Sequence, residues 1–140
     1  MTGCAAKLGR RRNQRGSTLI ESALALWVFA VLLAGITELG LTGLVFNSVE
    51  YAAQRAARYA SVNGSSSGHA ASAATIQSLA QQYATPLNAS GLVVSVTWTP
   101  NNSPGSTVQV QVSYAITPSI LPLDGGPLTL KGTAIQTIVQ

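Results

Sequence analysis

Side chains that can act in catalysis or metal binding are few and scattered in this sequence. It has one Cys, one His and four acidic residues among 140 positions, and no two of them lie within four positions of each other: Cys4, Glu21, Glu38, Glu50, His69 and Asp124. Nucleophile–base pairs and metal centres need such groups together. We therefore expect neither an enzyme nor a bound metal or cofactor. His69 is expected to be solvent-exposed near a helix start, and Asp124 to lie in a turn.

Two of the carboxylates, Glu21 and Glu38, interrupt a strongly apolar segment, residues 19–46. An unpaired carboxylate drawn into lipid or protein costs a few kcal/mol, so each should lie at a membrane edge or meet a partner. Glu21 is either a carboxylate that reaches back to water or one that is neutralised in an assembly. Glu38 either marks the outer membrane boundary, about 25 Å of helix beyond Glu21, or forms a polar stripe with Gly35 and Thr42 that contacts another helix.

A long helix must position these carboxylates. The apolar segment is long enough to span a bilayer, and the helical pattern continues beyond it. One face then carries Val49, Ala52, Ala53, Ala56 and Ala60, and another carries Glu50, Gln54 and Arg58. Arg55 and Arg58 are expected on a solvated or ion-pairing face. Asn63-Gly64 should end the helix, which we predict from about Ser17 to Val62 with a length of roughly 70 Å.

Positive charge is concentrated before this helix. Five of the eight basic residues precede Gly16, and no acidic residue precedes Glu21; the five are Lys7, Arg10, Arg11, Arg12 and Arg15. The positive-inside rule then predicts a single-pass protein with a cytoplasmic amino terminus and the rest of the chain outside. Nucleic acid is not an expected partner, because no aromatic residue interleaves the basic run and the run abuts an apolar segment. Membrane lipid is.

The remaining residues predict a small head of mixed structure. A second helix is expected over 70–85, where apolar residues recur at helical spacing. Strands are expected over 92–98, 108–114 and 128–139, because apolar residues alternate with polar ones there. The alternation of the last strand changes face around Gly132, which would suit a bulge. The predicted fold class is α+β: a long N-terminal helix packed against a short second helix and a roughly three-stranded antiparallel sheet.

The boundary between the basic run and the apolar segment carries a family resemblance. Gly16-Ser17-Thr18-Leu19-Ile20-Glu21 resembles the processing site of type IV pilins and pseudopilins, which a membrane prepilin peptidase cuts after the glycine. The resemblance implies that residues 1–16 are a cleaved leader and that Ser17 becomes the first residue. Its new ammonium group would neutralise Glu21 when subunits pack with their helices side by side.

The later part of the predicted helix carries a resemblance to a more specific family. Ile36-Thr37-Glu38-Leu39-Gly40, followed by an Ala/Arg-rich stretch that ends in Ala57-Arg58-Tyr59-Ala60, resembles the TadE-like family of the tight-adherence (Tad, type IVc) pilus system. The family implies a minor pilin or pseudopilin of the bacterial inner membrane, incorporated into a pilus after assembly. Implied partners are the prepilin peptidase, the major pilin, other minor pilins and the inner-membrane assembly platform with its ATPase.

The expected organisation is therefore a leader (1–16), a long helix (17–62) with its transmembrane part at about 19–46, and an extracytoplasmic α/β head (63–140). Two other classes remain open. The chain could be a permanently anchored periplasmic binding module in which Gly16 and Glu21 are coincidental. It could also be a secreted protein cut after Leu32-Leu33-Ala34, although leucine occupies a position where signal peptidase prefers a small residue.

Overall fold

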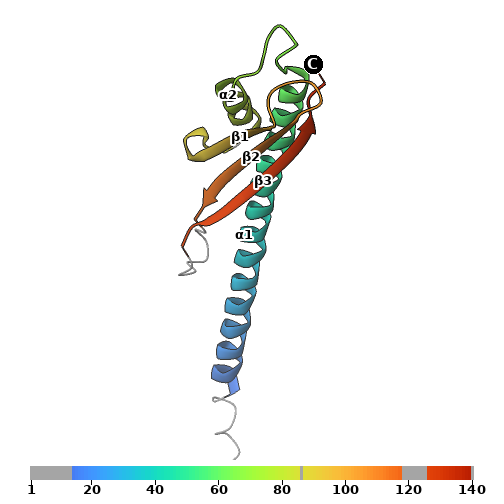
Figure 1. The fold of residues 1–140 in the computed structure, drawn as a ribbon. Helices are drawn as coiled ribbons and strands as arrows, with labels where there is room; N and C mark the ends of the chain where they lie inside the picture. The colour runs from blue at the N-terminus through green and yellow to red at the C-terminus, as the bar shows by residue number, and fades with distance from the viewer. Residues whose placement is uncertain (1–13, 86, 118–125, 140) are drawn as a thin grey trace, which may run out of the picture. The chain divides into compact units, whose positions relative to one another are not determined.

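The computed structural model describes residues 14–85, 87–117 and 126–139. Two α-helices, one short 3-10 helix and three strands follow one another along the chain (Figure 1): α1 (Gln14–Val62), α2 (Ala73–Tyr83), η1 (Ala89–Gly91), β1 (Leu92–Thr99), β2 (Thr107–Ile116) and β3 (Leu128–Thr137). The predicted fold class is confirmed, because the three strands form one antiparallel sheet that packs against the helices.

The chain divides into two compact units, residues 1–37 and 38–140, with the division inside α1. The described part of the first unit is helix alone. α1 begins at Gln14, earlier than the predicted start at Ser17, so Gly16 already lies within the helix. It ends at Val62, as Asn63-Gly64 predicted.

The second unit is built on the meander β1-β2-β3, and the predicted alternation along its strands is confirmed. In β2 the valines at 108, 110 and 112 are fully buried, whereas Gln109 is exposed. Val94 of β1 faces Val112, and Val112 faces Gly132 of β3. One face of the sheet therefore points to the core and the other is open.

The predicted bulge at Gly132 is wrong. The pairing of β2 with β3 runs without a break from Thr107 opposite Thr137 to Ile116 opposite Leu128. Gly132 instead lies on the inner face, where a Cβ atom would stand 2.8 Å from the Glu50 Cα atom of α1. The glycine is there because two backbones approach closely. The apparent change of face came from an apolar residue on the open face, Ile135, which is 61% exposed.

The core forms where the second half of α1, α2 and the inner face of the sheet meet. As predicted, α1 contributes its alanine-rich face, and every buried apolar residue on it is Val or Ala: Val49, Ala52, Ala53, Ala56, Ala57 and Ala60. α2 contributes Ile76 and Ala80, and the segment after β3 contributes Ile138. The two isoleucines of this core come from α2 and the segment after β3, whereas α1 contributes five alanines and one valine.

Local hydrogen bonds fix the ends of the helices. The Tyr59 carbonyl at the end of α1 accepts from the Asn63 side chain at 2.9 Å, and the Ser61 carbonyl accepts from the Val139 N–H at 2.9 Å. The Ser72 hydroxyl accepts from the Thr75 N–H at 3.1 Å and caps α2. This cap starts α2 at Ala73, so the helix is shorter than the predicted range 70–85.

The contact between Gly132 and α1 gives a stability prediction. Gly132→Ala should lower the free energy of unfolding of the head by about 1–3 kcal/mol, because the added methyl group forces two backbones apart. The full chain would be unfolded with urea in detergent and followed by Trp98 fluorescence, with Trp27→Phe removing the other tryptophan. Thr133→Ala, at the exposed neighbouring position, is the control and should change little. Equal midpoints for the two variants would contradict the close approach.

Candidate functional site

The most prominent feature of α1 is its uncovered apolar surface. Every large apolar side chain from Leu19 to Leu44 is exposed, from 38% for Val31 to 74% for Ile20. The exposed residues occupy all sides of the helix. A helix that is apolar all round needs lipid or other protein around it, and within the described residues α1 is the one helix long and apolar enough to cross a membrane.

Three hydroxyl side chains in and after this segment are bonded to the helix itself. Thr37, Thr42 and Ser48 donate to the carbonyl oxygens of Leu33, Glu38 and Leu44, each at 2.9 Å. Polar groups in hydrocarbon must find partners inside the protein. These three hydroxyls meet that requirement within one turn of helix, so they place no demand on lipid or on a neighbouring chain.

The sequence-predicted processing residues lie at the start of α1. Gly16 and Ser17 are exposed in the helix, and a Cβ at Gly16 would meet nothing within 4 Å. Glu21 is also exposed, one turn further along. It has no hydrogen bond or ion pair to any residue within the described ranges.

The basic residues predicted to set topology are mostly outside the described residues. Lys7, Arg10, Arg11 and Arg12 lie there, and Arg15 lies in the first turn of α1.

Glu38 lies partly buried on α1, and its carbonyl is the acceptor for Thr42. Gly35, Glu38 and Thr42 are spaced for one helical face, as the polar-stripe hypothesis requires, and all three are partly buried. His69 is exposed shortly before α2, as predicted.

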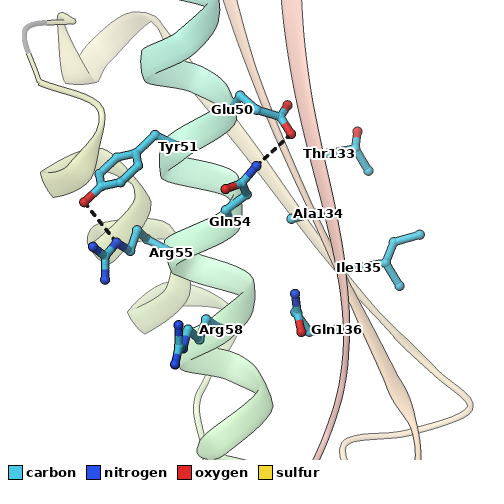
Figure 2. A pocket seen from close by; sticks show the side chains of 9 residues that line it. All are labelled: Glu50, Tyr51, Gln54, Arg55, Arg58, Thr133, Ala134, Ile135 and Gln136. Carbon is cyan, nitrogen blue, oxygen red and sulfur yellow. Dashed lines mark hydrogen bonds between the residues drawn. The ribbon is translucent and has the colours of Figure 1, made fainter.

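In the second unit, a polar pocket of about 540 Å³ opens between α1 and β3. Figure 2 shows the lining residues Glu50, Gln54 and Arg58 on the helix and Thr133 and Gln136 on the strand beside it. Gln54 donates to the Glu50 carboxylate at 3.3 Å. The pocket has no nucleophile–base pair, and the described residues hold no group of three potential metal ligands. Its chemistry is hydrogen bonding and charge.

An aromatic–cation cluster in the second unit was not predicted. Arg55 donates from Nε to the Tyr51 hydroxyl at 2.9 Å, and its Cζ lies 5.1 Å from the Tyr51 ring centroid and 5.9 Å from that of Tyr83. The rings of Tyr51 and Tyr83 meet edge to face at 6.1 Å. The spacing of Tyr51 and Arg55 by four residues could have indicated their contact, but nothing in the sequence indicates Tyr83. Arg55 therefore pairs with aromatic rings, whereas Arg58 is exposed as expected.

These features define a class of protein with one apolar helix, long enough for a single membrane span, that continues into a small α+β unit. Comparison with known families is more specific: the family model described as TadE-like protein matches residues 16–58. No curated protein and no solved structure matches the chain. The N-terminal region, residues 16–58 of the 140, is thus similar to the TadE-like family, as the resemblance indicated.

The exposed apolar surface predicts how α1 tolerates charge. Leu32→Lys should reduce the fraction of the chain that resists alkaline extraction from membranes, since a lysine at the centre of a span costs about 2.5–3.5 kcal/mol. Ile135→Lys is the matched control, because Ile135 is 61% and Leu32 60% exposed. It lies on the open face of the sheet and should leave extraction unchanged. Equal behaviour of the two variants would contradict a span in this segment.

Proposed function

We propose that the protein is a minor pilin or pseudopilin that acts in the assembly or structure of a Tad-type pilus. The role is structural and not catalytic. The chain is anchored in the bacterial inner membrane with its amino terminus in the cytoplasm and its head outside. Prepilin peptidase cuts it after Gly16, and the mature subunit packs into the filament through α1.

One observation carries this proposal: the uncovered apolar surface of α1 lies within the region matched by the TadE-like family model. Lipid covers such a surface while the subunit is in the membrane. After extraction by the assembly platform, apolar helices of the major pilin and other minor pilins cover it. The same surface therefore serves first as an anchor and then as a packing surface.

Glu21 supplies the electrostatic step of this mechanism. It lies exposed in an apolar stretch of α1, with no partner among the described residues. Cleavage after Gly16 creates an ammonium group on Ser17, four residues before it. In a stack of helices, the ammonium of one subunit neutralises the Glu21 carboxylate of a neighbour, which removes the cost of burying either charge alone.

Cleavage is tested first. Gly16→Val should leave the uncut chain in the membrane, because a branched side chain replaces the glycine at the scissile bond. Gly40→Val is the control, since a Cβ at Gly40 also meets nothing within 4 Å, and it should be processed normally. Intact mass and N-terminal sequencing of membrane-extracted protein give the readout. A wild-type chain that still begins at Met1 would identify a permanently anchored module, and one that begins near Gly35 a secreted protein.

Incorporation is tested next. Glu21→Ala should insert and be cleaved normally, yet its content in sheared filaments should fall at least about tenfold, because the unpaired ammonium group costs more than 1.4 kcal/mol. Glu50→Ala removes a carboxylate from the second half of α1 and is the control. Normal incorporation of the Glu21 variant would refute the charge-pairing step.

A further inference from the structure

The polar pocket between α1 and β3 lies beside a free edge of the sheet. β3 is the last strand in the order β1-β2-β3, so it pairs with β2 on one side only. It approaches the α1 backbone closely at Gly132, and the chain meets α1 again just after β3, where the Val139 N–H donates to the Ser61 carbonyl. Between these two contacts, the exposed Thr133 and Ile135 line the pocket. The edge of β3 is therefore open along the pocket.

Two hydrogen bonds show which backbone groups of β3 point to this edge. In the register of the β2–β3 ladder, the Ile138 N–H donates to the Ser106 carbonyl at 2.8 Å, whereas the Val139 N–H donates away from β2, to α1. Hydrogen-bonded and non-hydrogen-bonded pairs alternate along an antiparallel ladder, so the odd-numbered residues of β3 point away from β2. Thr133 and Ile135 thus direct two N–H and two C=O groups to the edge. Within the described residues, these four groups have no hydrogen-bond partner.

This edge lacks the features that usually prevent strand pairing. Proteins protect exposed edges with charged residues, prolines or bulges. From Gly132 to Thr137, β3 is uncharged and contains no proline, and its pairing with β2 is unbroken. Such an edge can accept another extended segment as an added strand. A helix cannot fill this role, because its own backbone groups are already paired along the helix.

The charge at one end of the pocket selects an acidic segment. Figure 2 shows Glu50 at the end of Thr133 and Arg58 at the end of Gln136. The Arg58 guanidinium has no hydrogen bond or ion pair within the described ranges, and Arg55, three positions earlier, adds a second positive charge. Glu50 is about 12 Å of helix away from Arg58, beyond the roughly 8 Å screening length of physiological salt. The Arg58 end is therefore positive.

The dimensions of the pocket suit a short extended segment. Four residues of β3, 133–136, line it and extend about 13 Å. On the helix side, the distance from Glu50 to Arg58 is about 12 Å. A segment of about four residues that pairs with β3 therefore reaches along the whole pocket to Arg58.

We propose that the pocket binds an extended, acidic peptide segment of another protein. The segment pairs with Thr133 and Ile135 as a fourth strand, and its carboxylate meets Arg58. The proposal concerns the unit 38–140 alone, so it depends neither on cleavage after Gly16 nor on incorporation into a filament.

A second copy of the chain is the competing partner, but its described residues do not provide such a segment. Its strands β1, β2 and β3 contain one charged residue, Lys131, which is basic. Glu21, Glu38 and Glu50 lie in α1, whose helical backbone cannot pair with the edge of a strand. The acidic segment is therefore assigned to a different protein.

The charge is tested with the full chain, isotope-labelled for NMR in detergent micelles and titrated with the synthetic peptide acetyl-Thr-Val-Thr-Val-Glu-Thr-amide. The peptide should shift the amide signals of Thr133 and Ile135. Arg58→Gln should weaken binding about fivefold, which corresponds to one exposed ion pair. Lys131→Gln removes the same charge outside the pocket and is the control, so it should weaken binding far less.

The backbone pairing is tested at Ile135. Ile135→Pro removes an N–H that points to the edge and leaves the N–H groups that face β2 in place, so it should weaken binding about tenfold. Ile135→Thr changes the same side chain but keeps the N–H, and it should bind the peptide as wild type does. Unchanged amide signals of Val110 and Val112 in both variants would verify that the sheet is intact.

Equal binding by the two Ile135 variants would refute strand pairing, and equal losses in the Arg58 and Lys131 variants would refute the acidic end. The same shifts with free glutamate would reduce the pocket to an anion site and overturn the proposal. A wild-type dimer that Ile135→Pro dissociates would assign the edge to a second copy. None of these outcomes affects the pilin proposal, which cleavage and filament content test separately.

Discussion

The fold of the head depends on how closely the backbone of α1 can be approached. From Val49 to Ala60 its buried face carries no side chain larger than valine. Gly132 of β3 lies so close that an added Cβ atom would stand 2.8 Å from the Glu50 Cα atom. A small domain buries little surface, so its large residues must fill their space well. Ile76, Ile138 and the valines of β2 do so only because α1 presents a nearly smooth surface.

The two parts of α1 differ in what surrounds them: the first part has an uncovered apolar surface, and the second part packs against the sheet. From Leu19 to Leu44 its large apolar side chains point outward on every side, and the hydroxyls of Thr37 and Thr42 bond to its own backbone. From Val49 to Ala60 its small side chains point into the core, while Gln54 and Arg58 face water. The change from large to small apolar residues along one helix is therefore a change of partner, from lipid or neighbouring helices to the chain's own sheet.

Periodicity predicted the elements but not the contacts between them. The alternation in β2 and the alanine face of α1 are local patterns, and both were predicted correctly because burial of one face dictates them. Gly132 was misread as a bulge, since the reason for a glycine was a backbone 82 positions earlier in the chain. The contact of Tyr83 with Arg55 was missed for the same reason: only the packing of α2 on α1 brings them together.

In the proposed function, Glu21 has a role that it would lack in a simple membrane anchor. A helix that only spans a bilayer gains nothing from an acidic group among Leu19, Ile20 and Leu24, and the group opposes insertion by up to a few kcal/mol. The same group favours assembly if packing brings a cation to it, because a buried pair is stable where a single buried charge is not. No basic residue of the sequence from Ser17 to Gln54 can serve, as none occurs there. In the proposed function, the cation is the ammonium group that cleavage after Gly16 would create on Ser17.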